Sequence, residues 1–307
     1  MENSFLTVGT QVFILFILMA LGFLARKLKW LDQQSVSGIT NLMLYLITPC
    51  LLINAFQRPF AAEQMRGFLI TAAAAAGTHI VAIFLSMALI HDKDKAKQSV
   101  QRFAAIFSNC GYMSLPLQQA LLGDEAVFYG AAYIAVFNIF LWTYGLALMC
   151  GGKGASLRRA VLNPGTVSVV VGLALFFGSV TLPEVIAKPI QYLSAMNTPM
   201  PMIIIGYYLA GMRFKTAFSG PGSFVALGLK LIGFPLLLLG VLWLCGVRGL
   251  PLISSVISCS APVATISTMF ATRYGGDAEL SSALVAVSTL FSIVTMTAIV
   301  GLAGVVA

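Results

Sequence analysis

The sequence predicts an all-α protein that crosses a membrane with ten helices, arranged as two repeats of five helices with opposite orientation. Three observations lead to this prediction. Of the 307 residues, 59% are hydrophobic and 9% are charged, whereas a soluble domain carries about 25% charged residues. Apolar blocks of roughly 20 residues, the length that spans a bilayer, recur along the chain. Short motifs of the first half return, in the same order, in the second half.

Ten apolar blocks are long enough to form transmembrane helices. Nearly all charged residues fall between the blocks, in the connections. The blocks cover residues 7–25, 36–56, 68–90, 103–122, 126–150, 161–180, 190–212, 224–244, 252–272 and 280–300.

Positive charge is distributed unequally between the two sides of the membrane that these blocks define. The odd-numbered connections hold thirteen lysine and arginine residues, and the even-numbered connections hold four. By the positive-inside rule the thirteen face the cytoplasm, so both termini are expected outside a cytoplasmic membrane. The net charge of +8 then reflects loops that contact anionic membrane lipid, and it does not indicate a nucleic-acid partner.

Two short motifs indicate an internal repeat. Gly123-Asp124-Glu125-Ala126 returns as Gly276-Asp277-Ala278-Glu279 at an offset of 153 residues, and Thr48-Pro49 returns as Thr198-Pro199 at an offset of 150. A duplication with halves at residues 1–150 and 157–307 explains both. Because each half has an odd number of spans, the second half enters the membrane from the opposite side. Secondary transporters commonly have such inverted repeats, with substrate sites near the bilayer midplane.

The fourth and ninth blocks contain helix-breaking residues at repeat-related positions. Gly111 and Pro116 interrupt the fourth block, and Pro262 interrupts the ninth. Proline removes a backbone donor, and irregular backbone within a membrane persists only where protein or a wet cavity satisfies it. The half-helices after the breaks would point their positive N-termini at the membrane centre, which favours an anion. Ordinary proline kinks are the alternative interpretation.

The positions of these breaks indicate which residues are candidates for substrate binding. We expect them to be residues beside the two breaks, together with two polar residues of the fifth and seventh blocks that are equally consistent with helix packing. The candidates are Asn109, Cys110, Gly111, Ser260, Pro262, Asn138 and Thr198.

Ionisable residues within the blocks are few. All ten acidic residues lie in connections, so no carboxylate at membrane depth is available for a proton or sodium site. His79 is expected to be a neutral hydrogen-bonded core group, and Lys230 is expected to extend along its helix to the cytoplasmic interface. Transport without ion coupling and coupling through neutral groups both remain open.

Other classes of protein fit the sequence less well. There are only two histidines, no HExxH motif and no acid within a block, so the residues of an intramembrane protease are missing. We therefore predict no enzyme activity, no metal site and no cofactor. A channel is a remote alternative, because paired broken helices can also form a pore.

The residues around both breaks resemble those of the auxin efflux carrier family. The resemblance rests on Asn109 with Met113, Leu115, Pro116 and Leu117, on Pro262 with Phe270, Ala271 and Tyr274, and on Asn41 with Pro49. Ser267 departs from the plant members, which have a second proline there. The long cytosolic loop of plant members is also missing between the fifth and sixth blocks.

This resemblance implies a fold like that of the bile acid/sodium symporters. Spans one, two, six and seven would form a scaffold domain, and spans three to five with eight to ten would form a transport domain that moves like an elevator. It also implies small carboxylate substrates, carried by efflux or uniport. A proton- or sodium-coupled symporter of a dicarboxylate such as malate or malonate is the alternative. A homodimer through the scaffold stays open.

Overall fold

The computed structural model describes residues 2–151, 156–211 and 214–307, which fold as helices joined by short connections. Most helices are α-helices, four short segments are π-helical (η1, η2, η3 and η5), and η4 is a 3₁₀-helix. In chain order the elements are α1 (Glu2–Lys27), α2 (Gln33–Leu42), η1 (Met43–Ile47), α3 (Thr48–Ala55), α4 (Ala62–Leu89), α5 (Lys95–Ile106), η2 (Cys110–Ser114), α6 (Leu115–Leu122), α7 (Asp124–Phe140), η3 (Leu141–Gly145), α8 (Leu146–Met149), α9 (Leu157–Leu162), α10 (Pro164–Phe177), α11 (Glu184–Ala195), α12 (Pro199–Leu209), η4 (Phe214–Phe218), α13 (Pro221–Gly228), η5 (Leu229–Gly233), α14 (Phe234–Leu244), α15 (Gly249–Ser260), α16 (Ile266–Tyr274) and α17 (Ala278–Val306).

Six continuous helical stretches in the described ranges are long and apolar enough to cross a membrane. They are Gly9–Lys27, Gln33–Ala55, Ala62–Leu89, Asp124–Met149, Pro221–Leu244 and Ala278–Val306. The fourth, sixth, seventh and ninth predicted blocks instead fold as shorter helices, with non-helical residues between α5 and η2, α9 and α10, α11 and α12, and α15 and α16. The predicted all-helical membrane class is confirmed.

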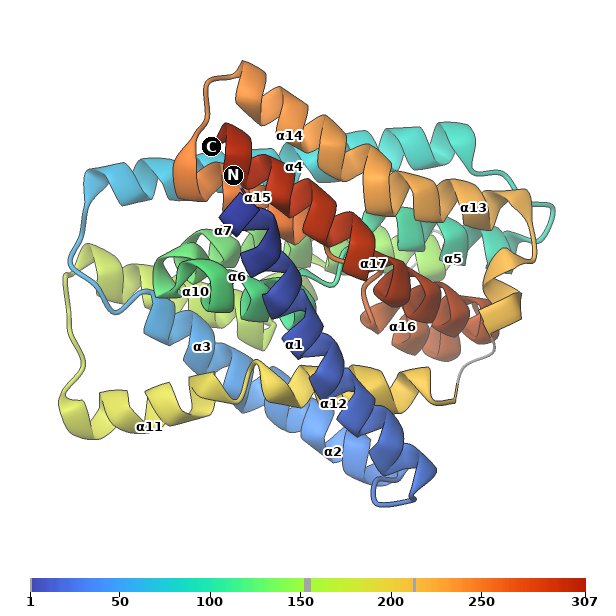
Figure 1. The fold of residues 1–307 in the computed structure, drawn as a ribbon, viewed down its shortest axis with the longest axis horizontal. Helices are drawn as coiled ribbons and strands as arrows, with labels where there is room; N and C mark the ends of the chain where they lie inside the picture. The colour runs from blue at the N-terminus through green and yellow to red at the C-terminus, as the bar shows by residue number, and fades with distance from the viewer. Residues whose placement is uncertain (1, 152–155, 212–213) are drawn as a thin grey trace.

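The helices gather in two regions that are joined by long central helices (Figure 1). At one end, α2 and α3 lie against α11 and α12. At the other end, α4 and α14 pack against α15, and α13 packs against α5. The helix α1 packs on both α12 and α17, so the two ends of the chain lie close together, with Gly9 beside Thr297. This arrangement places the two interrupted stretches, α5 to α6 and α15 to α16, in the centre of the molecule.

Two glycines allow α1 and α12 to approach with their backbones in contact. A Cβ atom built on Gly206 would overlap the carbonyl oxygen of Met19, and one built on Gly22 would overlap the carbonyl oxygen of Ile203. Small residues at such positions are the usual means of close helix packing in membranes, where dispersion contacts rather than the hydrophobic effect hold helices together. The α1–α12 pair is therefore packed at backbone distance.

Replacing Gly206 should separate this pair. We expect Gly206→Ala to destabilise the protein by about 1–3 kcal/mol, the usual cost of overpacking, because the opposing atoms are backbone and cannot move aside. Thermal unfolding in detergent, followed by size-exclusion chromatography, would show this as an unfolding temperature several degrees lower. Gly240→Ala in α14 is the matched control, because nothing lies within 4 Å of its added Cβ. Equal unfolding temperatures for both variants would contradict the close packing.

Candidate functional site

The two interrupted stretches meet through their backbones. The Asn109 amide donates to the carbonyl oxygen of Pro262 at 2.7 Å, and the Ala264 amide donates to the carbonyl oxygen of Phe107 at 3.0 Å. These bonds form an antiparallel bridge between Ser108 and Val263. We call the paired segments 107–109 and 262–264 the crossover. The pairing satisfies backbone groups that no helix satisfies, as the membrane interior requires.

The sequence explains the break in the second stretch more directly than the break in the first. Pro262 lies in the extended segment, and the preceding residue Ala261 is extended (φ −58°, ψ 145°), as residues before proline prefer. In the first stretch the chain leaves the helix at Phe107 (φ −96°, ψ 116°). Gly111 and Pro116, also selected as helix breakers, lie after this break, within η2 and at the start of α6. The helix is continuous from η2 into α6, and Pro116 follows the turn in which Leu115 donates to the carbonyl oxygen of Cys110, five residues back.

Both half-helices that follow the breaks begin without a side-chain cap. The N-cap residues are Asn109 before η2 and Thr265 before α16, and neither side chain accepts a hydrogen bond from its helix. The first amide groups of a helix have no intrahelical acceptor, and they carry about half a positive charge. The side-chain Nδ2 of Asn109 is buried and also lacks a partner. At the start of α16 the amides of Ser267 and Thr268 donate to the carbonyl oxygens of Ala264 and Thr265. The donors without a partner therefore lie mainly at the start of η2.

Open space lies beside the first of these N-termini. A Cβ atom added to Gly111 would meet no other atom within 4 Å. The next residue, Tyr112, packs against a cluster of buried residues from α2, η1 and α12. The start of η2 thus faces α2, η1 and α12, with room next to Gly111 for another group.

A buried polar network ties the two stretches together near the crossover. Gln118 Nε2 donates to Ser114 Oγ at 2.6 Å and to Ser258 Oγ at 2.9 Å, and the two serine oxygens lie 3.1 Å apart. All three residues are almost fully buried. The sequence analysis did not select Gln118. The sequence could have identified Gln118, because a glutamine two residues after Pro116 in an apolar block needs hydrogen-bond partners.

The remaining predicted residues divide into two groups. Cys110 and Ser260 flank the crossover, and both are buried, with the Ser260 hydroxyl lacking a partner. Asn138 lies elsewhere, with its side-chain nitrogen beside Gly165 at the start of α10. Thr198 lies at the break between α11 and α12, next to Asn197, whose side-chain oxygen accepts a hydrogen bond from Thr48 at 3.0 Å. The structure therefore brings Asn109, Cys110, Gly111, Ser260 and Pro262 together.

The expectation for Lys230 is wrong. Its side chain is 2% exposed, and its Nζ donates to the carbonyl oxygen of Cys259 at 3.0 Å. Because α15 ends at the crossover, its last carbonyl groups lack helical partners and attract a cation. Lys230 therefore turns inward from η5 instead of extending to the interface.

His79 is a buried hydrogen-bonded group. Its Nδ1 lies 2.7 Å from the carbonyl oxygen of Ala75, which requires the proton on this nitrogen. The ring stacks on Phe140, with centroids 5.1 Å apart, and lies near Phe107 of the crossover at 5.9 Å. The Nε2 atom has no partner among the described side chains.

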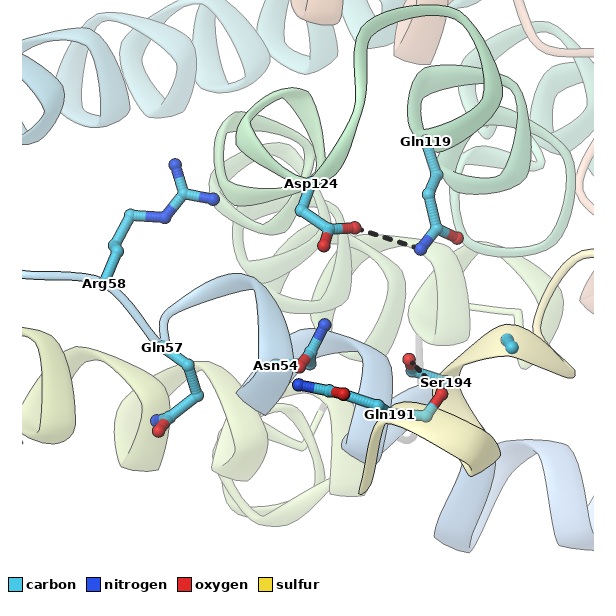
Figure 2. A pocket seen from close by; sticks show the side chains of 8 residues that line it. Asn54, Gln57, Arg58, Gln119, Asp124, Gln191 and Ser194 are labelled. Atoms are coloured by element: carbon cyan, nitrogen blue, oxygen red, sulfur yellow. Dashed lines mark hydrogen bonds between the residues drawn. The ribbon is translucent and has the colours of Figure 1, made fainter. Parts of the chain in front are cut away.

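A polar cavity of about 390 Å³ is lined in part by α6, the helix that carries Gln118 of this network (Figure 2). Gln119 of α6 lines it, directly after Gln118 of the network, and its side chain donates to Asp124 at 3.0 Å. The cavity lies between α3 and α11 on one side and α6 and α7 on the other. Its lining residues are Asn54, Gln57, Arg58, Gln119, Asp124, Gln191, Ser194 and Ala195.

Arg58 is the cation among the residues that line this cavity. Its Nε donates to the carbonyl oxygen of Ala55 at 3.0 Å, and its guanidinium lies 5.5 Å from the Phe128 ring centre. Burial lowers the pKa of Arg58, while Glu125 and Asp124 act in the opposite direction. An arginine remains protonated at neutral pH, so the cavity lining contains a cation as well as the Asp124 side chain.

Known proteins resemble this chain over most of its length. A protein of Rhizobium meliloti named "Putative malonate transporter" is 26% identical over 294 residues, which are 92% of this chain and 91% of that protein. An "Uncharacterized transporter" of Methanothermobacter thermautotrophicus is 26% identical over 285 residues, 91% of this chain and 93% of that protein. Auxin efflux carrier component 3a of Oryza sativa is 26% identical over 133 residues, 42% of this chain and 22% of that protein.

The sequence profile of a family described as "Membrane transport protein" matches residues 7–156 and 153–300. Since these ranges cover nearly the whole chain, and auxin efflux carriers are among its relatives, the protein belongs to this membrane transport family, that of the auxin efflux carriers.

Proposed function

We propose that the protein is a carrier for a small organic carboxylate anion, which binds at the crossover. One observation carries this proposal: two uncapped helix N-termini meet at paired backbone segments, beside the unpartnered Nδ2 of Asn109. An ionised carboxylate is an acceptor-only group, so it matches a site that offers donors. The open space beside Gly111 provides the volume.

A short dicarboxylate is the substrate class that we favour. The two half-helices belong to different halves of the chain, and a dicarboxylate offers one carboxylate to each N-terminus. The relative from Rhizobium meliloti, which matches over nine-tenths of both chains, carries malonate in its name. We therefore choose malonate as the test anion.

The proposed mechanism is alternating access by an elevator-type movement of two inverted repeats, residues 1–150 and 157–307. The scaffold would comprise α1–α3 and α9–α12, and the transport domain α4–α8 and α13–α17. The close contact of α1 and α12 supports the scaffold, since Gly22 and Gly206 hold the two helices at backbone distance. The cavity between α3, α11 and α6 lies between the two proposed domains and would be an entrance.

Transport by reconstituted protein tests this function. We expect proteoliposomes to exchange labelled malonate in counterflow and to accumulate it when a potassium diffusion potential makes the inside positive. The reason is that a uniported anion follows the membrane potential. Imposed sodium and pH gradients are compared in parallel. Strict dependence on either gradient would favour the ion-coupled symporter, and large single-channel currents without counterflow would favour the channel.

Asn109 tests the site itself. We expect Asn109→Ala to weaken malonate binding about tenfold, because one charge-assisted hydrogen bond is lost. Malonate-induced thermal stabilisation of the purified protein measures this affinity. Asn41→Ala, on an exposed position of α2, is the matched control. If malonate stabilises Asn109→Ala as strongly as the wild type, the anion binds elsewhere.

Cys245 tests the proposed orientation, in which both termini lie outside. This exposed residue follows α14, in a connection proposed to face outside. We expect a membrane-impermeant maleimide to label it in right-side-out vesicles, and Cys245→Ser to abolish the labelling. Labelling that requires permeabilised vesicles would mean the reverse orientation.

A further inference from the structure

A lysine occupies the end of the broken helix α15. Lys230 Nζ donates to the carbonyl oxygen of Cys259, which is the second-last residue of α15, three residues before Pro262. The C-terminus of a helix carries partial negative charge on carbonyl groups without helical partners. The C-terminus of α15 is therefore a favourable position for a cation within the membrane, and the Lys230 ammonium group occupies it.

The same ammonium group is close to the first half of the crossover. The π-helical segment η5, which carries Lys230, contacts both α15 and α5, the helix that leads into the first half of the crossover. Cys110 opens η2 directly after Asn109, at the uncapped N-terminus. Lys230 is therefore held at the end of α15, and α15 itself packs against η2. A positive charge there would add to the positive field at the N-terminus of η2.

No carboxylate in the described ranges balances this charge. The acidic residues lie at helix ends and in connections, and the hydrogen bond of Lys230 goes to a neutral carbonyl oxygen. An ammonium group has three donors, and a buried charge without a partner is strongly unfavourable. A counter-ion that arrives from outside the protein would remove this imbalance.

His79 holds the matching position in the first half, 151 residues before Lys230. Its surroundings differ. The imidazole packs among the rings of Phe107, Tyr133, Phe137 and Phe140, and its hydrogen bond stays within α4. A protonated imidazole there would have no acceptor for Nε2 other than these rings. The fixed positive charge of the crossover is thus supplied by the second half.

We propose that Lys230 is the resident cation of the crossover and supplies the positive charge that a co-transported sodium ion would otherwise bring to the bound anion. This inference rests on the proposed function. A cation that travels with the substrate needs oxygen ligands near the anion, and the carbonyl oxygen of Cys259 is already engaged by the lysine. Anion binding therefore needs the lysine and no sodium.

The test measures malonate affinity of the purified protein by thermal stabilisation, in sodium chloride and in choline chloride. We expect the wild-type affinity to differ less than twofold between the two salts. Lys230→Met, which keeps the unbranched side chain up to Cε without the charged amine, should bind malonate at least tenfold more weakly. Lys188→Met, on the exposed surface of α11, is the matched control and should bind as the wild type does.

A second variant separates a missing charge from altered packing. Lys230→Ala leaves space for a small cation, so ethylammonium chloride should restore part of its malonate affinity. The same salt should have no effect on Lys230→Met, in which the side chain fills the space. A purely structural role of Lys230 would not produce this cation dependence. If neither variant folds, Lys230→Arg decides, because it keeps the charge and should retain sodium-independent binding.

The outcomes distinguish this inference from the proposed function. A wild-type protein that neither binds nor exchanges malonate would contradict the proposed function, and the inference with it. A wild-type protein that binds malonate only in sodium would contradict the role of Lys230 alone. Unchanged affinity in Lys230→Met, or lost binding in a folded Lys230→Arg, would do the same.

Discussion

The crossover depends on two extended segments that satisfy each other's backbone groups inside the protein. Water is not available there, so a helix that stops at Phe107 must find partners for its exposed amide and carbonyl groups. The segment at Pro262 provides them, through bonds of 2.7 and 3.0 Å. Since each break would be unfavourable alone, the two are mutually dependent. The polar network of Ser114, Gln118 and Ser258 and the cap of Lys230 on α15 follow from this pairing.

Much of the fold could be predicted because the lipid environment of the chain determines which helices can form. Lipid requires long apolar helices, and composition and block length reveal them directly. The breaks could also be located approximately, because Pro262 and the small polar residues around it are exceptional in an apolar block. The first break was harder to predict from the sequence. Proline usually marks irregular backbone, but Pro116 follows a π-helical turn and starts α6, nine residues after Phe107 leaves the helix.

The side-chain contacts of the site were harder to predict, because they depend on which face of a helix meets the break. Lys230 lies close enough to the end of its block for an extended side chain to reach the interface, and only the position of α15 directs it inward. Asn138 shows the opposite case. Its polarity within the fifth block made it a candidate, yet α7 turns it toward Gly165 and α10. Sequence periodicity identifies the helix in both cases, but the tertiary packing of neighbouring helices determines the partner.

The crossover also divides its polar groups by chemical type. Pairing of the segments uses the carbonyl oxygens of Phe107 and Pro262, which are the strong acceptors at the break. The groups left over include the first amides of η2 and the Asn109 Nδ2, and the Lys230 ammonium has donors beyond its bond to Cys259. Gln118 Oε1 is an unpaired acceptor, but it is directed toward Gly130 of α7. A site with surplus donors and a fixed positive charge lacks only acceptors, and a carboxylate supplies them without bringing any donor of its own. The same arrangement disfavours a cation, so the anion selectivity that we propose would arise from the way in which the two broken helices pair.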